Sequence, residues 1–201
     1  MEKRSAALAV MEGALPHVAF DGWSVPALEH GARAAGFGPE ILVRLFPGGP
    51  LDALDLWLRD ADRRMEEAYA ALTPPPHKIR ERIAALIRLR LEAYAPHKEA
   101  VRRALAACAL PWHAHRGVAA LARTVDAMWH AAGDAATDFN WYTKRALLAA
   151  VYSSTVLYWL NDRSADHAAT WAFLDRRIDN VMQIGRSKQA LKETFYKAVR
   201  R

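Results

Sequence analysis

The spacing of apolar residues along the chain predicts helices throughout. Between residues 51 and 72, apolar side chains recur at intervals of three, four and seven, which is the repeat of one helix face. These residues are Leu51, Leu54, Leu58, Met65 and Leu72. Asp52, Asp55, Arg59 and Asp62 fall off this stripe. Over the whole chain we predict about ten helices and no strand, at residues 3–19, 25–35, 39–46, 51–72, 77–94, 97–109, 113–132, 140–161, 166–184 and 187–200.

One predicted helix differs from the others because residues 146–160 are apolar on nearly every side. A membrane-spanning helix needs about 20 apolar residues, and this stretch is shorter. A helix that is apolar all round is typical of a protein core. We therefore expect residues 146–160 to form a buried central helix.

The pattern predicts an all-α fold in three parts. Residues 1–48 form a helix-turn-helix-like segment, residues 49–185 a helical body, and residues 186–201 a basic amphipathic tail helix. Within the first part, Val25–Phe46 reads as a short helix, a glycine turn and a second helix. This segment resembles the N-terminal segment of TetR-type regulators, which also precedes a helical ligand-binding body.

The helix-turn-helix pattern is degenerate. A recognition helix reads base edges with polar side chains and holds phosphates with basic ones. The second helix here offers only Glu40 and Arg44, and residues 25–46 carry no net formal charge. We therefore expect no nucleic-acid partner, although a ligand-responsive TetR-type transcriptional regulator remains the alternative.

The positive charge of the chain is concentrated at its end. The formal net charge is +6, and residues 186–201 contribute +5 of it. On a helical wheel the tail separates an apolar side from a basic one, which is typical of a helix lying in a membrane interface. The predicted membrane-binding residues are Lys188, Leu191, Lys192, Phe195 and Val199. An anionic membrane surface is the expected partner, and docking on the protein itself or on a dimer partner is the alternative.

The sequence lacks the motifs of common catalytic sites. Cys108 is the only cysteine, so an intrachain disulfide and a multi-thiolate metal site are excluded. His113 and His115 are the only close histidine pair, and side chains two apart do not share a helix face. No Glu-x-x-His pair, glycine-rich phosphate loop or nucleophile elbow occurs. We expect no catalytic residue, no metal and no cofactor, with an independent enzyme as the disfavoured alternative.

Two segments carry a resemblance to a known family. Residues 138–152 read Asp-Phe-Asn-Trp-Tyr-Thr-Lys-Arg-Ala-Leu-Leu-Ala-Ala-Val-Tyr, and residues 170–182 read Thr-Trp-Ala-Phe-Leu-Asp-Arg-Arg-Ile-Asp-Asn-Val-Met. Together they resemble the COQ9 family, the lipid-binding auxiliary proteins of ubiquinone biosynthesis. The resemblance implies a TetR-like homodimer with a hydrophobic lipid pocket, which delivers an isoprenoid quinone precursor to a di-iron hydroxylase. It also implies a patch for that hydroxylase at Asp138, Trp141, Tyr142 and Arg145.

The lipid pocket implied by the resemblance needs a dry channel between helices. Candidates come from the predicted helices 77–94, 140–161 and 166–184. The predicted lipid-binding residues are Leu86, Leu147, Val151, Leu157, Trp159, Trp171, Leu174 and Met182. A composition rich in Ala and Arg is typical of a bacterium with a GC-rich genome. We therefore expect a protein of the bacterial cytoplasm, peripheral on the inner membrane, whose eukaryotic relatives work on the matrix side in mitochondria.

Overall fold

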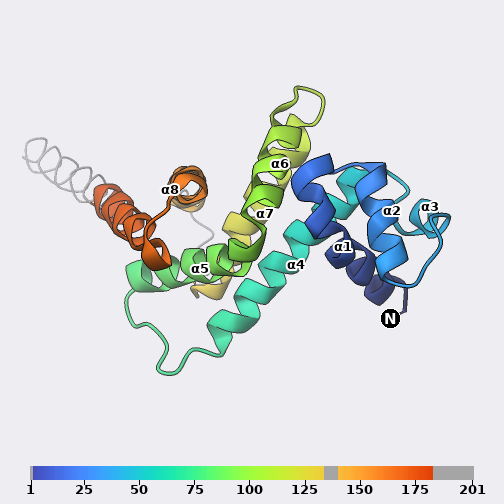
Figure 1. The fold of residues 1–201 in the computed structure, drawn as a ribbon. Coiled ribbons are helices and arrows are strands. Elements are labelled where there is room, and N and C mark those ends of the chain that lie inside the picture. The colour runs from blue at the N-terminus through green and yellow to red at the C-terminus, as the bar shows by residue number, and fades with distance from the viewer. Residues whose placement is uncertain (1, 134–139, 183–201) are drawn as a thin grey trace, which may run out of the picture.

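The computed structural model describes residues 2–133 and 140–182. Every regular element in these ranges is helical and no strand occurs there, which confirms the predicted all-α class (Figure 1). The α-helices are α1 (Glu2–Asp21), α2 (Val25–Ala34), α3 (Ile41–Leu45), α4 (Pro50–Ala70), α5 (Ile79–Tyr94), α6 (Lys98–Ala109), α7 (Ala114–Ala131) and α8 (Asn140–Asn161). Two 3₁₀ helices, η1 (Ala95–His97) and η2 (Ala165–His167), connect longer elements, and residues 168–182 are also helical. The tenth predicted helix, residues 187–200, lies outside the described residues.

Helices α1 and α2 pack into a tight pair. α2 begins after Ser24, whose hydroxyl oxygen accepts a hydrogen bond from the Ala27 N–H at 3.3 Å, as a serine cap does. Gly31 then allows close contact, because a Cβ at this position would lie 2.2 Å from the Val10 carbonyl oxygen. The backbones of the two helices therefore touch where a larger residue would hold them apart.

The second helix of the helix-turn-helix segment is shorter than predicted. α3 covers Ile41–Leu45, whereas the prediction covered residues 39–46, because the two residues before α3 form a turn that opens at a proline. Val43 on α3 is 79% exposed, and Glu40 and Arg44 are exposed beside it. The outer side of α3 thus presents one apolar side chain between two of opposite charge.

α4 joins the N-terminal helices to the rest of the molecule (Figure 1). It contacts α1 as well as α5 and α7, so it buries side chains on more than one side. Asp60 and Asp62 are 2% and 6% exposed. Asp62 is therefore buried although it lies off the apolar stripe, because α4 buries a wider arc than the single stripe that the sequence shows.

Residues 146–160 form the middle of α8, and the predicted burial of this helix holds for part of its surface only. Val151 and Trp159 are buried, whereas Leu157 is 58% exposed and Tyr158 is 39% exposed. α8 packs against α5 and α7, but these contacts leave Leu157 and Tyr158 partly at the surface. None of the described helices is long and apolar enough to cross a membrane.

Asp162 connects the end of α8 to the helical residues 168–182. One carboxylate oxygen accepts hydrogen bonds from the N–H and hydroxyl of Ser164 at 2.8 and 2.7 Å. The other accepts from the N–H and hydroxyl of Thr170 at 2.9 and 2.5 Å. Burial acts to raise the pKa of Asp162, but these bonds outweigh it and hold the pKa far below its usual range. The ionised carboxylate thus fixes the turn between the two helices.

Candidate functional site

A largely apolar cavity of about 400 Å³ lies between α6, α7 and α8, with residues of α4 and α5 at its buried end. We call it the central cavity. Its apolar walls include Val101, Leu105, Val118, Leu121, Val156 and Leu157. Pockets that enclose a drug-sized ligand span roughly 300–1,000 Å³. The central cavity is therefore large enough for one end of a long lipid, but it does not enclose a long polyprenyl chain.

Small residues bring the helices around the central cavity close together. On α6, Val101, Ala104 and Cys108 recur at intervals of three and four, which places them on one face. On α7, a Cβ built at Gly117 would lie 2.9 Å from the Cys108 Cβ. The close contact of α6 and α7 at this point therefore depends on a glycine, and both Gly117 and Cys108 line the cavity.

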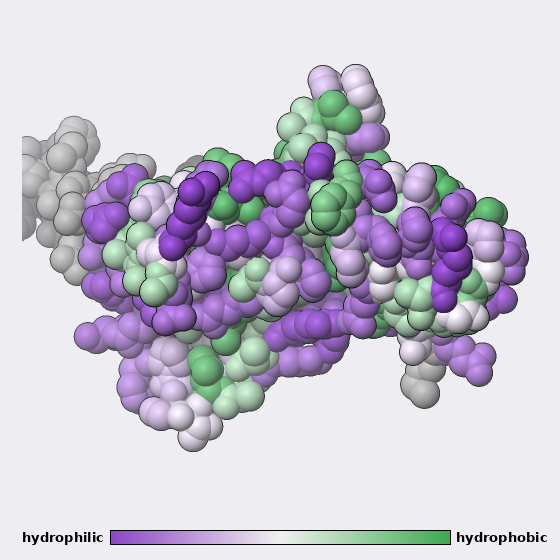
Figure 2. Space-filling model, viewed as in Figure 1, coloured by the Kyte–Doolittle hydropathy of each residue, from purple (hydrophilic) through white to green (hydrophobic). Residues whose placement is uncertain are grey.

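The outer rim of the central cavity reaches the surface. Leu105, Val118 and Leu157 line it and are 40%, 67% and 58% exposed, respectively. Figure 2 shows hydrophobic side chains around the protruding end of α6 and α7, on a face that is otherwise largely hydrophilic. An apolar ligand chain can therefore leave the cavity over an apolar rim.

The buried end of the central cavity is polar. Arg90 is 1% exposed, and its guanidinium pairs with Asp62 while its Nε–H donates to the Tyr152 hydroxyl at 2.8 Å. Asp62 also accepts from the Thr124 hydroxyl at 2.9 Å and from the Arg123 Nε–H at 3.2 Å. A buried charge is tolerated when it is paired and hydrogen-bonded, and this network meets that requirement. Arg90, Thr124 and Tyr152 line the cavity, so its closed end offers hydrogen-bonding groups.

Sequence reasoning did not select these polar residues, although a signal was present. Arg90 lies within the apolar stripe that includes Leu86, Ile87 and Leu91. An arginine within such a stripe indicates a buried charge that needs a partner. That signal points to Arg90 but not to Asp62, because only the tertiary structure brings α4 beside α5.

A second apolar cavity, of about 300 Å³, lies between α5, α7, α8 and residues 168–182. We call it the peripheral cavity. Three predicted lipid-binding residues line it, namely Leu147, Val151 and Met182, with Arg80 and Lys144 also in its wall. The structure thus brings these three predicted residues together, but in a different place from the central cavity.

The remaining predicted lipid-binding residues lie elsewhere. Leu157 lines the central cavity. Leu86, Trp159 and Leu174 are fully buried and line neither apolar cavity. Trp171 is half-buried beside the Arg88 guanidinium, which lies 5.3 Å from the centre of its ring, and it lines neither cavity. Sequence reasoning identified apolar residues of the right helices, but it did not separate core from cavity wall.

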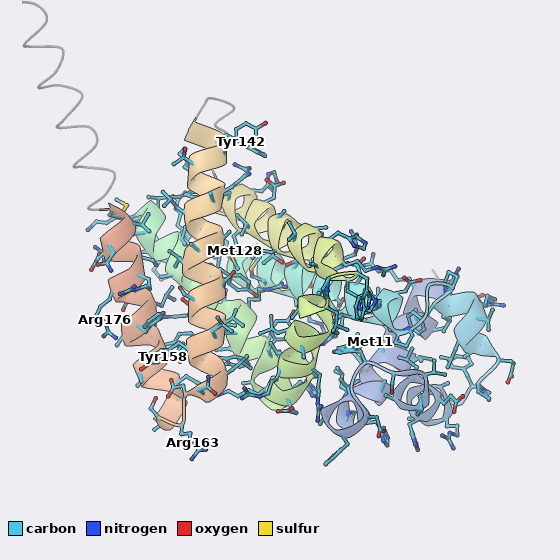
Figure 3. The ribbon with its side chains drawn as sticks, turned by 90° about the horizontal axis from the view of Figure 1, so that it is seen from above. Met11, Met128, Tyr142, Tyr158, Arg163 and Arg176 are labelled. Atoms are coloured by element: carbon cyan, nitrogen blue, oxygen red, sulfur yellow. The ribbon has the colours of Figure 1, made fainter. Side chains whose placement is uncertain are left out.

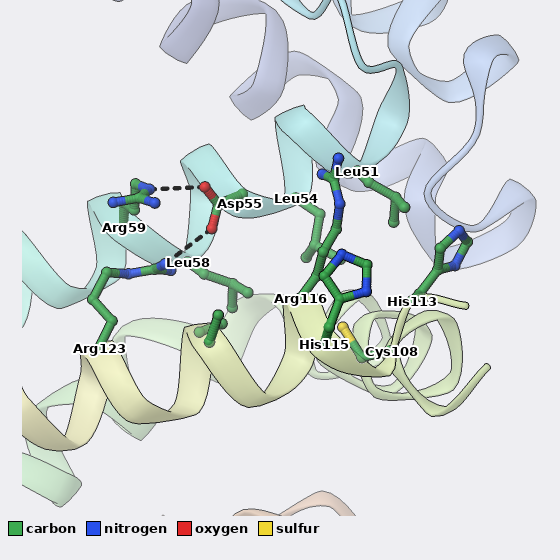
Figure 4. A pocket seen from close by; sticks show the side chains of 12 residues that line it. Leu51, Leu54, Asp55, Leu58, Arg59, Cys108, His113, His115, Arg116 and Arg123 are labelled. Carbon is green, nitrogen blue, oxygen red and sulfur yellow. Dashed lines mark hydrogen bonds and ion pairs between the residues drawn. The ribbon is translucent and has the colours of Figure 1, made fainter. Parts of the chain in front are cut away.

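A polar cleft of about 230 Å³ lies beside the central cavity, between α4 and α7 (Figure 4). Asp55 pairs there with Arg59 at 2.8 Å and Arg123 at 3.0 Å. Burial acts to raise the pKa of Asp55, but the two guanidinium groups hold it below its usual value. His113 and His115 also line the cleft. Within residues 2–133 and 140–182, no group of three or more His, Cys, Asp or Glu is placed to hold a metal ion.

Three of the four residues of the predicted partner patch lie within the described part of the chain. The Arg145 guanidinium lies 3.8 Å from the centre of the Trp141 ring and pairs with Asp126 of α7 at 2.6 Å. Tyr142 packs edge-on against Trp141, with ring centres 4.7 Å apart, and is 74% exposed. Figure 3 shows Tyr142 projecting from the beginning of α8. The structure therefore brings three of the four predicted residues together, and Asp138 lies outside the described residues.

The predicted membrane-binding residues also lie outside the described residues. They are Lys188, Leu191, Lys192, Phe195 and Val199. Their role stays a prediction from the sequence.

Comparisons with known proteins agree with the resemblance and the fold. A family model described as COQ9 matches residues 114–185. The Homo sapiens "Ubiquinone biosynthesis protein COQ9, mitochondrial" is 31% identical over 196 residues, covering 92% of this chain and 60% of the relative. The Schizosaccharomyces pombe "Ubiquinone biosynthesis protein coq9, mitochondrial" is 30% identical over 177 residues, covering 86% of this chain and 68% of the relative. The chain thus spans about 60% of the length of its human relative.

The solved structures include a similar fold. The TetR transcriptional regulator from Nitrosomonas europaea superposes with a TM-score of 0.69 at 21% sequence identity, covering 89% of this chain and 97% of that one. At this identity the likeness concerns the fold alone. It confirms the predicted TetR-like architecture.

Proposed function

Because the chain belongs to the COQ9 family, we propose that it serves ubiquinone biosynthesis as a non-catalytic lipid-binding protein. It binds an isoprenoid quinone precursor at the membrane and presents it to the di-iron hydroxylase of the pathway. The names of the mitochondrial relatives support the pathway. The central cavity supports the binding of a lipid, because its walls are apolar and its rim is open.

In this proposal, lipid binding, membrane attachment and contact with the hydroxylase each use a different part of the protein. The central cavity holds the lipid, and the basic tail, residues 186–201, attaches reversibly to an anionic membrane. The patch formed by Trp141, Tyr142 and Arg145 contacts the hydroxylase, since Trp, Tyr and Arg are the residue types enriched at binding hot spots. In a bacterium the protein acts on the cytoplasmic side of the inner membrane, and in eukaryotic relatives on the matrix side. It acts as a homodimer, which light scattering of the purified protein tests.

The decisive experiment is solvent extraction of protein purified without detergent, followed by mass spectrometry of the extract. We expect a near-stoichiometric isoprenoid lipid. Ala104→Phe fills the central cavity, because Ala104 is a buried residue of its wall, and should remove most of the lipid. Ala106→Phe places the same side chain on the exposed side of α6 and should retain it. An empty wild-type extract, or equal lipid in both variants, contradicts binding in the central cavity.

The membrane role has a separate test. Leu191→Asp with Phe195→Asp removes apolar residues from the predicted tail helix, and flotation with anionic liposomes measures attachment. We expect attachment to weaken, because each apolar side chain that enters the interface contributes roughly 1.5–3 kcal/mol. Unchanged flotation would show that the tail is not the membrane contact.

A further inference from the structure

The connection between α6 and α7, residues 110–113, projects beyond the helices around it (Figure 1). We call it the α6–α7 tip. Its apolar side chains reach solvent, since Leu110 is 40% exposed, Trp112 is 65% exposed, and Pro111 between them is exposed as well. Single apolar side chains are common on protein surfaces, but a contiguous group of them marks a contact site. The α6–α7 tip is such a group.

Hydrogen bonds hold the tip in one conformation. The His113 N–H donates to the Leu110 carbonyl oxygen at 2.9 Å, and the Arg116 N–H donates to the His113 carbonyl oxygen at 2.9 Å. The His113 ring lies edge-on to the Trp112 ring, 6.0 Å between centres, and its Nδ1 lies 3.3 Å from the Ala107 carbonyl oxygen. The exposed indole is therefore carried by an ordered turn, which has little conformational freedom left to lose on binding.

The charges around the tip suit an anionic partner. Residues 100–123, which comprise most of α6, the tip and the first part of α7, contain four arginines and no acidic residue. The acids that pair with these arginines belong to α4 and to the beginning of α6, as Asp52 pairs with Arg116 at 3.2 Å. An anionic lipid surface attracts basic residues, and the tip itself presents no carboxylate that such a surface would repel.

An indole at the end of a projecting turn is typical of side chains in a membrane interface, because its ring is apolar and its N–H can face the head groups. A stable protein interface buries roughly 800 Å² on each partner and needs a complementary surface, whereas a convex turn enters fluid lipid without one. We propose that the α6–α7 tip inserts Leu110 and Trp112 into the interface of an anionic membrane. The inference rests on the membrane attachment proposed above and adds a second contact, on the folded body.

Insertion of the tip brings the mouth of the central cavity to the membrane. The rim residues Leu105 and Val118 belong to the two helices that the tip connects. Leu105 precedes the tip by five residues and Val118 follows it by five, which is about 8 Å along a helix. Interfacial segments enter the boundary of head groups and acyl chains by about 5–10 Å. An inserted tip therefore places this apolar rim at the membrane surface.

Flotation of the full chain with vesicles of phosphatidylcholine and phosphatidylglycerol tests the tip. The variants are Trp112→Asp and Val43→Asp, which change the net charge equally. Val43 is the matched control because it is 79% exposed on α3, in the N-terminal helices. We expect Trp112→Asp to lower the partition coefficient at least about tenfold, the effect of withdrawing one large apolar side chain from lipid. Val43→Asp should lower it less than twofold, and both variants should keep the thermal midpoint of the wild type.

A fluorescent label reports insertion directly. Cys108→Ser combined with Trp112→Cys, or with Val43→Cys, leaves one thiol for a dye that is sensitive to its environment. On addition of vesicles, emission from the dye at position 112 should shift to the blue and be quenched by nitroxides on the acyl chains. Emission from the dye at position 43 should do neither.

Three results contradict the proposal in different ways. Equal flotation of the two aspartate variants, or a dye at position 112 that stays in water, overturns insertion of the tip while attachment by the tail stands. If Trp112→Asp floats as the wild type does but no longer binds the hydroxylase, the tip is a protein contact instead. If the wild type itself does not float, the contacts proposed for the tip and for the tail are both wrong.

Discussion

The guanidinium of Arg145 lies over the indole ring of Trp141, 3.8 Å from its centre. The two residues are one turn apart on α8, and the same guanidinium reaches Asp126 on α7. The contact therefore fixes the Trp141 ring and ties the beginning of α8 to the helix before it. Tyr142 rests edge-on against the ordered ring, with most of its own surface in solvent. An exposed aromatic residue held in place in this way loses little entropy on binding a partner.

The first prediction concerns this patch. Tyr142→Ala should weaken binding to the di-iron hydroxylase at least tenfold, as truncation of an aromatic hot spot does. Its effect on thermal stability should be small, because Tyr142 is 74% exposed. Surface plasmon resonance with the purified hydroxylase measures the affinity. Trp112→Ala is the matched control, since Trp112 is 65% exposed at the junction of α6 and α7. If only the Trp112 variant loses binding, the partner contacts that junction instead.

A second prediction concerns the buried pair of Arg90 and Asp62. Asp62→Asn leaves a buried guanidinium without its carboxylate, and removing one partner of a buried pair costs about 3–5 kcal/mol. Urea unfolding should show this loss in the free energy of unfolding. Asp55→Asn on the same helix is the control, because surface pairs contribute only about 0–1 kcal/mol. Replacing both partners, with Asp62→Leu and Arg90→Met, should recover much of the loss. A single variant as stable as the wild type would mean that the pair does not hold α4 against α5.

Asp162 leads to a third prediction, which concerns pH. Its folded-state pKa is depressed, so its contribution to stability is fully present above the unfolded value of about 3.9 and is lost as the pH falls through the folded value. At pH 7, Asp162→Asn should cost about 1–3 kcal/mol, because the amide nitrogen that replaces one carboxylate oxygen cannot accept the hydrogen bonds donated by Ser164 or Thr170. The difference from wild type should shrink below about pH 4, where the unfolded chain takes up a proton.

Thermal unfolding at pH 7 and pH 3 measures this difference. Asp175→Asn serves as the control, because Asp175 forms a surface pair with Arg88 at 3.5 Å. A gap between wild type and Asp162→Asn that stays constant down to pH 3 would contradict the role of the ionised carboxylate.

The fourth prediction compares a glycine required for close helix packing, Gly31, with a glycine required for its positive φ angle, Gly36. Gly31→Ala would place a Cβ 2.2 Å from the Val10 carbonyl oxygen, and overpacking of this kind costs typically about 1–3 kcal/mol. Gly36→Ala meets no atom within 4 Å but has a φ of +80°, which costs roughly 1–2 kcal/mol by strain alone. Gly31→Ala should therefore loosen the pairing of α1 and α2, and Gly36→Ala should not. Hydrogen exchange of the α2 amides distinguishes them, and equal protection in both variants would contradict the close-packing explanation.

The local features of this fold could be predicted from the sequence, and the cavities could not. The apolar spacing located the helices, and a Ser-x-Pro sequence marks the beginning of α2 through Ser24. The burial of Asp62 could not be predicted, because it depends on α4 being packed between α1 and the pair α5 and α7. For the same reason Trp159 and Leu157, two residues apart on one apolar helix, differ between full burial and 58% exposure. Which apolar residue faces a cavity depends on how neighbouring helices fail to fill the space between them.

The fifth prediction uses Cys108, which lines both the central cavity and the polar cleft. Burial raises the pKa of its thiol, and the nearby Arg116 offsets this only in part. A free cysteine has a pKa of about 8.5, so Cys108 carries less of the reactive thiolate at pH 7.5. Its modification by a disulfide reagent should be slower than that of a free thiol. The rate should still rise as the pH is increased past 9, because the thiolate is the species that reacts.

The same thiol reports on occupancy of the central cavity. Adding a short isoprenoid hydrocarbon as a probe should slow modification of Cys108 further, because a ligand in the cavity covers one side of the sulfur. Cys108→Ser combined with Ala106→Cys moves the thiol to the exposed side of α6 and is the matched control. This control should react at the rate of a free thiol and should not be protected by the probe. Equal rates for the two thiols would show that Cys108 is open to solvent, and protection of both would mean that the probe covers the outside of α6.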